Sequence, residues 1–184
     1  MKVIMFGAPG AGKGTISKEL EKVLDIPHVS TGDMLRQAVK DETELGLMVK
    51  DLMGTGDLIP DEIMDGVVEE QLSKMPSYFL DGYPRTLPQA KCYLGFDKPD
   101  AVVVLRVKDD VILERLLRRA KIEGREDDTE EVIRKRLGIY REETSPILTY
   151  FESEQINVRE VDGDNTIDGT TDKVLSALRE KMEI

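Results

Sequence analysis

The stretch KVIMFGAPGAGKGT, residues 2–15, joins a short apolar run to a glycine-rich turn that ends in a lysine and a threonine. Residues 2–6 are typical of a buried strand, and the apolar residues of 13–24 fall on one face of a helix. Glycines let backbone N–H groups point inward around an anion, and the following helix adds its positive N-terminal end. This context favours a phosphate-binding P-loop over an ordinary tight turn.

The last position of the P-loop pattern differs from expectation. The pattern G-x-x-x-x-G-K-S/T ends in a hydroxyl for magnesium, but this chain has Gly14 there and the hydroxyl one place later, at Thr15. A dinucleotide-binding turn, G-x-G-x-x-G, is the alternative, but from Gly10 it meets Thr15 where its third glycine should stand. That alternative also gives Lys13 no role. The sequence favours a P-loop whose magnesium contact is unusual.

Short apolar runs alternate with longer amphipathic ones along the rest of the chain, which predicts βαβ units. Further strands are expected at 28–30, 78–82, 101–107 and 157–161, and helices at 34–39, 45–53, 63–72, 109–120, 128–151 and 171–182. We expect Asp61 to cap the helix at 63–72 and Pro146 to bend the one at 128–151. The predicted fold class is α/β, an open, doubly wound five-stranded parallel sheet, with ligands at the carboxyl ends of the strands.

The amino-acid composition argues against several classes of function. The chain has 184 residues and a formal net charge of −11, which argues against general affinity for nucleic acid or anionic membranes. Positive charge gathers between Arg106 and Arg141, so a local basic site remains. One cysteine, Cys92, and one histidine, His28, cannot build a disulfide or a thiolate zinc site. We expect a cytoplasmic protein without a membrane span, and the acidic exterior suggests a monomer.

Five stretches carry a resemblance to one family. GAPGAGKGT (7–15), STGDMLR (30–36), LDGYPRT (80–86), GREDD (124–128) and EEVIRKRLGIYREETSPIL (130–148) resemble adenylate kinase in order and spacing. The resemblance implies a P-loop NTPase fold of the nucleoside monophosphate kinase type. It implies a single kinase domain with a core at 1–29, 60–118 and 129–184, a monophosphate-binding flap at 30–59 and a short lid at 119–128. The implied reaction is ATP + AMP ⇌ 2 ADP with Mg²⁺, so the partners are the small molecules ATP, AMP and ADP.

The same resemblance assigns roles to individual residues. Catalytic residues would be Lys13, Arg85, Arg119, Arg125 and Arg136. ATP would meet Gly10, Ala11, Gly12, Lys13, Gly14, Thr15, Arg115, Arg119 and Asn165. AMP would meet Thr31, Arg36, Asp57, Leu58, Ile59, Gly82, Tyr83, Pro84, Arg85, Gln89, Arg125 and Arg136. Asp81, Asp33 and Thr15 would hold Mg²⁺ through water. Phosphoryl transfer needs this many cations because two nucleotides bring several negative charges to one point.

Other basic and acidic residues of the region receive plainer interpretations. Arg118, Lys121, Arg134, Lys135 and Arg141 are expected on solvated helix surfaces. Asp127 and Asp128 are interpreted as helix-start and lid-hinge residues held by neighbouring arginines. The lid is too short for the four-cysteine zinc site of some relatives, so no structural zinc is expected.

Alternatives to an AMP kinase remain open from the sequence. UMP/CMP kinases share the short lid, but Thr31 and the placement of Gln89 favour AMP. The sequence gives little indication of which base the nucleoside triphosphate donor carries. A P-loop switch or ATPase is a different class, yet the chain lacks an N-K-x-D guanine motif and would not need Arg36, Arg85 and Gln89. A catalytically idle nucleotide-binding module is a third hypothesis.

Overall fold

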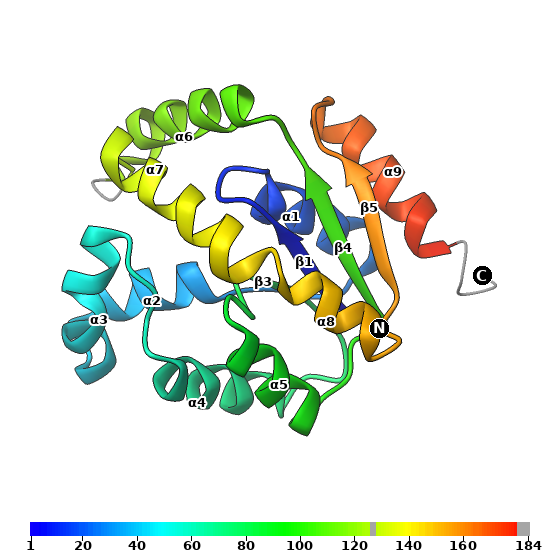
Figure 1. Cartoon of the computed structure of the whole chain (residues 1–184), viewed down its shortest axis with the longest axis horizontal. Helices are drawn as coiled ribbons and strands as arrows, with labels where there is room; N and C mark the ends of the chain where they lie inside the picture. The colour runs from blue at the N-terminus through cyan, green and yellow to red at the C-terminus, as the bar shows by residue number, and fades with distance from the viewer. Residues whose placement is uncertain (126–127, 180–184) are drawn as a thin grey trace.

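Five strands form one sheet in the middle of the molecule, in the order β2-β3-β1-β4-β5 (Figure 1). They are β1 (Lys2–Gly7), β2 (His28–Ser30), β3 (Tyr78–Asp81), β4 (Ala101–Arg106) and β5 (Val158–Asp162). The computed structural model describes residues 1–125 and 128–179, and each neighbouring strand pair within them is parallel. Parallel pairing brings the carboxyl ends of all these strands to one edge of the sheet.

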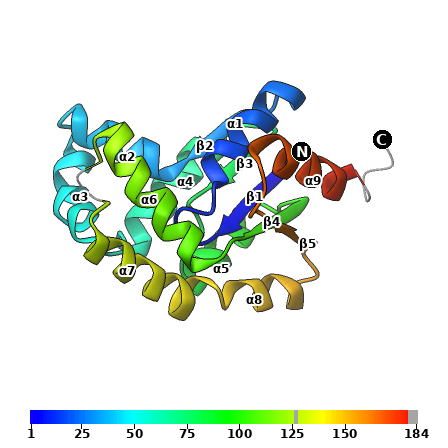
Figure 2. The ribbon, with the colours of Figure 1, turned by 90° about the horizontal axis from the view of Figure 1, so that it is seen from above.

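Helices cover both faces of the sheet (Figure 2). Val3 and Met5 of β1 pack on one side with α1 (Lys13–Leu24) and α9 (Ile167–Arg179). Ile4 and Phe6 pack on the other side with α4 (Asp61–Leu72), α5 (Leu87–Phe96) and α8 (Ile147–Ser153). Because strand residues point alternately to opposite faces, a strand buried on both sides is apolar throughout. The predicted doubly wound five-stranded parallel sheet is confirmed.

Four further helices lie around the carboxyl edge of the sheet. They are α2 (Thr31–Lys40), α3 (Glu44–Thr55), α6 (Asp109–Glu123) and α7 (Glu130–Ile139). The Ser30 hydroxyl caps α2 by accepting a hydrogen bond from the Asp33 amide at 3.2 Å, and the Thr129 hydroxyl caps α7 in the same way. Within residues 1–125 and 128–179, no helix has the length and apolar content needed to cross a membrane.

The long helix expected at 128–151 is wrong in detail. After α7, a π-helix, η1 (Tyr140–Thr144), continues the turn, and α8 starts only after Pro146. Ser145 and Pro146 keep right-handed helical dihedrals, so the helical path continues, and the proline, which has no amide hydrogen, interrupts the hydrogen bonding where a bend was predicted. The capping role expected for Asp61 is also wrong, because Pro60 holds the N-cap position and makes no side-chain cap. The Asp61 carboxylate instead accepts hydrogen bonds from Thr86 and Gln89.

Two other helices differ from expectation. The pattern did not predict α5, which starts after the Thr86 cap and buries Ala90 and Tyr93. The last helix was expected at 171–182, but α9 begins four residues earlier, at Ile167, and residues 180–182 lie outside the described residues. Helix ends depend on local capping more than on periodicity, which explains errors of this size.

Candidate active site

A cleft lies beyond the carboxyl ends of β1 and β3, where Met5 pairs with Asp81 in the sheet register. The glycine-rich turn forms its floor, α2 and the end of α3 form one wall, and α6 and α7 contribute arginines from the other side. The predicted site residues that line it are Gly10, Lys13, Thr31, Arg36, Asp57, Leu58, Ile59, Asp81, Gly82, Tyr83, Pro84, Arg85, Gln89, Arg119, Arg125 and Arg136. Segments far apart in the sequence therefore meet at one place.

Lys13 is fixed by the turn that precedes it. Gly12, at the N-cap of α1, has φ 94°, a left-handed conformation that favours glycine. The Lys13 ammonium donates to the carbonyl oxygens of Gly7 at 2.9 Å and Ala8 at 3.1 Å. Burial lowers the pKa of Lys13, as do the nearby cations Arg85 and Arg119, while Asp81 opposes the shift. The turn thus presents one poorly solvated cation at the floor of the cleft.

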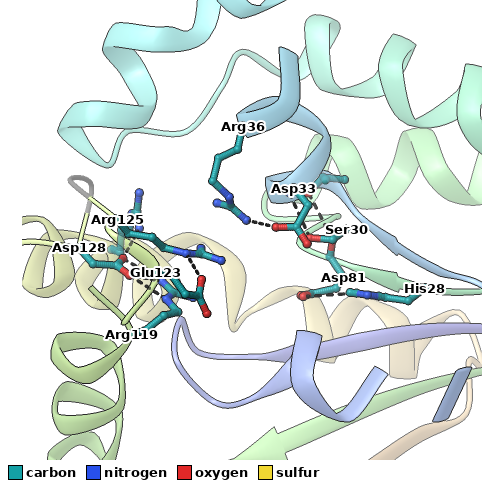
Figure 3. A network of polar contacts seen from close by, with 11 residues as sticks. His28, Ser30, Asp33, Arg36, Asp81, Arg119, Glu123, Arg125 and Asp128 are labelled. Atoms are coloured by element: carbon teal, nitrogen blue, oxygen red, sulfur yellow. Dashed lines mark hydrogen bonds and ion pairs between the residues drawn. The ribbon is translucent and has the colours of Figure 1, made fainter. Parts of the chain in front are cut away.

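Asp81 ends β3 beside the lysine. Its Oδ1 lies 3.9 Å from the Lys13 Nζ, and its Oδ2 lies 3.9 Å from the His28 Nε2 (Figure 3). Burial alone would raise the pKa of Asp81, but Lys13, then His28 and Arg85, bring it below the usual carboxyl value. A Cβ at Gly14 would lie 3.4 Å from the Asp81 Oδ2, so the missing side chain at this place leaves room beside the carboxylate.

One buried carboxylate holds two of the arginines. Asp128 is 2% exposed and accepts from Arg119 Nε at 2.7 Å and from Arg119 Nη2 at 2.8 Å (Figure 3). It also accepts from Arg136 Nη1 at 3.1 Å. The expectation that neighbouring arginines hold Asp128 is confirmed, while Asp127 lies outside the described residues. Arg125 is held separately, because its Nε donates to Glu123 at 2.6 Å. Arg125, just after α6, and Arg136 of α7 line the same cleft.

The loop after β3 carries a further arginine, Arg85. The Arg85 side chain donates from Nε to the Gly82 carbonyl at 2.7 Å. Its amide donates to Gln89 Oε1 at 2.7 Å, and its carbonyl accepts from the Thr144 hydroxyl at 2.8 Å. Gln89, predicted to face a base, uses the other end of its amide to donate to Asp61 Oδ1 at 2.8 Å. The backbone of Arg85 is thus held at both of its polar atoms by side chains.

Several predicted residues lie outside the lining of this cleft. They are Ala11, Gly12, Gly14, Thr15, Asp33, Arg115 and Asn165. Arg115 donates to the carbonyls of Gly163 at 2.9 Å and Ala11 at 3.5 Å, so it joins the glycine-rich turn to the chain after β5. Asp33 accepts from Arg36 at 2.5 Å, which ties a predicted magnesium residue to a predicted phosphate residue (Figure 3).

Two basic residues expected on solvated surfaces make contacts between elements. Lys135 of α7 forms an ion pair with Asp57, just beyond α3, at 2.6 Å. Arg141 of η1 pairs with Asp109 at the start of α6. Arg136 also donates to the Met53 carbonyl at 3.3 Å, so α7 is joined to the end of α3 at two points. No sequence motif marked Lys135, because its partner lies in a distant segment.

The oxygen atoms near the turn suit a hard cation. The Asp81 carboxylate, held ionised, and the exposed Thr15 hydroxyl are donors of the type that Mg²⁺ prefers. Among the described residues, no group of three or more acidic, histidine or cysteine side chains could hold a metal by itself. Magnesium that keeps several waters and binds phosphate oxygens does not require such a group.

Comparisons with known proteins agree on one family. A family model described as adenylate kinase matches residues 5–156. An adenylate kinase of Xylella fastidiosa (strain M12) is 42% identical over 186 residues, covering 97% of this chain and 99% of the relative. One from a Cyanothece species is 44% identical over 162 residues, with 84% and 83% coverage, and one from Xanthomonas euvesicatoria is 41% identical with 97% and 99% coverage.

Proposed function

The chain belongs to the adenylate kinase family and is a phosphotransferase, and from this premise we propose how its residues bind two nucleotides. The cleft receives the phosphate ends of ATP and AMP, and one phosphoryl group passes between them to give two ADP. The observation that carries this proposal is the meeting of Lys13 with arginines from α2, the β3 loop, α6 and α7 around one cleft in a protein of net charge −11. Fixed cations around the transferred group are what this chemistry asks of a protein.

ATP binds at the turn. Backbone amides of Gly10, Ala11, Gly12, Gly14 and Thr15 surround its phosphates. A phosphate oxygen replaces the carbonyl oxygens that the Lys13 ammonium contacts in this structure. Arg115 and Asn165 lie against the adenine of ATP, and the bond from Arg115 to the Gly163 carbonyl, two residues before Asn165 in the chain, supports this assignment.

AMP binds on the other side of the cleft. Arg36 and Arg85 hold its phosphate, since a guanidinium can donate two parallel hydrogen bonds to phosphate oxygens. The nucleoside lies against Thr31, Asp57, Leu58, Ile59, Gly82, Tyr83, Pro84 and Gln89. If Gln89 pairs with the adenine edge, its bond to Asp61 must be shared or exchanged when AMP arrives.

The transferred phosphoryl group lies between the two nucleotides. Arg119, Arg125 and Arg136 close over it, and the buried Asp128 keeps two of these guanidinium groups aimed at one place. Bound with the nucleotide, Mg²⁺ neutralises part of the phosphate charge. Asp81, Asp33 and Thr15 would hold its water ligands. The Asp81 carboxylate, which lies beside Lys13, supports this assignment.

Closure accompanies binding in this proposal. Residues 30–59 act as the flap over AMP and residues 119–128 as the short lid, while 1–29, 60–118 and 129–184 form the core. Closure keeps water from taking the phosphoryl group, which would turn the kinase into an ATPase. We further propose that the protein acts as a cytoplasmic monomer and needs no structural zinc.

A coupled assay tests the substrate assignment. ATP is supplied with AMP, UMP, CMP or GMP in separate reactions, and ADP formation is followed. We expect AMP to give the fastest reaction, in keeping with Thr31 and Gln89 in the cleft. Fast ADP formation with UMP or CMP and none with AMP would overturn the acceptor assignment while leaving the phosphotransferase class intact.

A further inference from the structure

Thr144 is the last residue of the π-helix η1, and its side chain bonds to the loop between β3 and α5. It is 7% exposed, and its hydroxyl donates to the Arg85 carbonyl at 2.8 Å. It also lines the cleft together with Tyr140, the first residue of η1. Single-turn π-helices inside α-helices occur frequently at functional sites. The widened turn here closes with a bond from the Ser145 amide to the Tyr140 carbonyl at 2.7 Å.

Thr31, at the start of α2, also bonds outside its helix, to the Asp81 carbonyl at 3.3 Å, whereas Thr55 and Thr171 make bonds within theirs. The Thr171 hydroxyl donates to the Ile167 carbonyl at 2.9 Å, within α9. The Thr55 hydroxyl donates to the Asp51 and Leu52 carbonyls, within α3. Such local bonds are the usual arrangement for threonine inside a helix. Thr144 makes its bond to a loop instead, so its hydroxyl serves a contact between elements.

The η1 segment is itself anchored to the sheet. The Tyr140 ring packs against Phe6 of β1, with ring centroids 6.2 Å apart. The other end of the segment reaches the loop between β3 and α5, where Thr144 meets Arg85. A carbonyl in such a loop has no partner from regular secondary structure, so the hydroxyl satisfies it. The π-helix therefore links the strand beneath the glycine-rich turn to the loop that carries Arg85.

We propose that Thr144 is a positioning residue for Arg85, acting through the hydrogen bond from its hydroxyl to the Arg85 carbonyl. Gln89 fixes the amide of Arg85, and Thr144 fixes the carbonyl, so the loop presents the guanidinium to the cleft in one orientation. The inference rests on the proposed role of Arg85 in holding the AMP phosphate. Losing the hydroxyl leaves a peptide carbonyl unpaired and lets the loop turn, which weakens AMP binding more than ATP binding.

The first test compares three variants. Thr144→Val removes the hydroxyl and keeps the shape, Thr144→Ser keeps the hydroxyl, and Thr171→Val is a matched control on α9 that also loses a hydroxyl bonded to a carbonyl. We expect Thr144→Val to raise the KM for AMP about tenfold while the KM for ATP stays within about twofold. Thr144→Ser should restore the KM for AMP, and Thr171→Val should leave it unchanged. An equal rise in both KM values, or no rise, would overturn the inference.

The second test separates this inference from the proposed role of Arg85. Arg85→Lys is made alone and together with Thr144→Val, and the KM for AMP is measured in all four proteins. If Thr144 acts through Arg85, Thr144→Val has little further effect in the Arg85→Lys protein. The same fold increase in both backgrounds would overturn the inference and leave the role of Arg85 standing. An unchanged KM in Arg85→Lys alone would overturn that role and, with it, the basis of the inference.

Melting temperatures are measured for every variant, so that loss of folding is recognised. Should Thr144→Val fail to fold, Thr144→Ala removes the same hydroxyl without the added methyl contact, and the same comparisons apply. A purely structural role for Thr144 would lower the melting temperature without the difference between the KM for AMP and the KM for ATP. That outcome would also overturn the inference.

Discussion

The cations of the cleft are held in two different ways. Lys13 follows its own strand and turn, and the carbonyls that its ammonium contacts belong to Gly7 and Ala8, a few residues earlier in the chain. Arg119 and Arg136 belong to different helices and share one carboxylate, Asp128. The first arrangement is local, whereas the second joins two helices through a residue that belongs to neither. The lysine should therefore tolerate changes elsewhere in the protein, while both arginines should respond to a change at Asp128, although Arg136 also donates to the Met53 carbonyl.

Removing the locally held cation should have the largest effect. Lys13→Ala leaves the glycine-rich turn intact but takes away the charge nearest the donor phosphates. We expect kcat to fall about a thousandfold, with little change in melting temperature, because the side chain serves phosphates more than packing. Lys22→Ala is the control on the same helix, since Lys22 is exposed and pairs only with nearby Glu19 among the contacts of the described residues. Full activity in Lys13→Ala would refute the P-loop assignment.

Removing the shared carboxylate should affect both activity and stability. Asp128→Asn leaves Arg119 and Arg136 side by side without the negative charge between them. We expect the free energy of unfolding to fall by about 3 kcal/mol, because a fully buried charge partner is lost. Activity should fall about a hundredfold as the guanidinium groups lose their orientation.

The matched control for this prediction is Glu130→Gln. Glu130 pairs with Arg134 on the exposed surface of α7, where an ion pair contributes little. Chemical denaturation and steady-state kinetics measure both proteins. If Asp128→Asn behaved like the control, the two arginines would not depend on the shared carboxylate, and the contrast with Lys13 would be lost.

Removing the Thr15 hydroxyl, which stands one place later than in the usual P-loop pattern, should have a smaller effect on activity. Thr15 is exposed and lies outside the cleft lining, so its effect on the metal acts at a distance, through water. We expect Thr15→Ala to raise the Mg²⁺ concentration for half-maximal activity about tenfold, with kcat at saturating Mg²⁺ reduced far less than in Lys13→Ala. A larger loss of kcat in Thr15→Ala than in Lys13→Ala would reverse the order of importance proposed for the turn.

The ion pair between α7 and the chain after α3 should give the smallest effect. Lys135→Asp breaks the pair with Asp57, and both partners are well exposed, at 43% each. We expect the KM for AMP to rise less than about fivefold at low salt and the difference to vanish at high salt.

A charge exchange supplies the control for that pair. The double variant Asp57→Lys, Lys135→Asp restores opposite charges in the reverse order, so its KM for AMP at low salt should lie below that of Asp57→Lys alone. If the double variant bound AMP worse than either single variant, the pair would not hold the end of α3 toward α7.

The sequence predicted what depends on nearby residues. The strand, turn and helix of residues 2–24 could be predicted because each follows from short-range pattern, and Lys13 is placed by them. The carboxyl-edge location of Asp81 followed from parallel strand pairing in the same way. The grouping of Arg119, Arg125 and Arg136 came from family resemblance, since their spacing alone allowed several arrangements.

What the sequence missed depends on tertiary contact. The helix α5 is stabilised by burying residues such as Tyr93 against other elements, and its own periodicity is weak. The bond from Thr144 to Arg85 and the pair of Lys135 with Asp57 join segments that no motif connects. The π-helix η1 was also missed, because the sequence around Pro146 predicted only a bend.

The most direct test of the whole account is whether ATP turnover requires an acceptor nucleotide. Consumption of ATP with Mg²⁺ is measured with AMP absent and then with AMP present. We expect negligible ATP turnover without AMP. When AMP is added, we expect rapid formation of two ADP for each ATP consumed, because the cleft binds two nucleotides. Equal ATP consumption with and without AMP would contradict this expectation and indicate an ATPase.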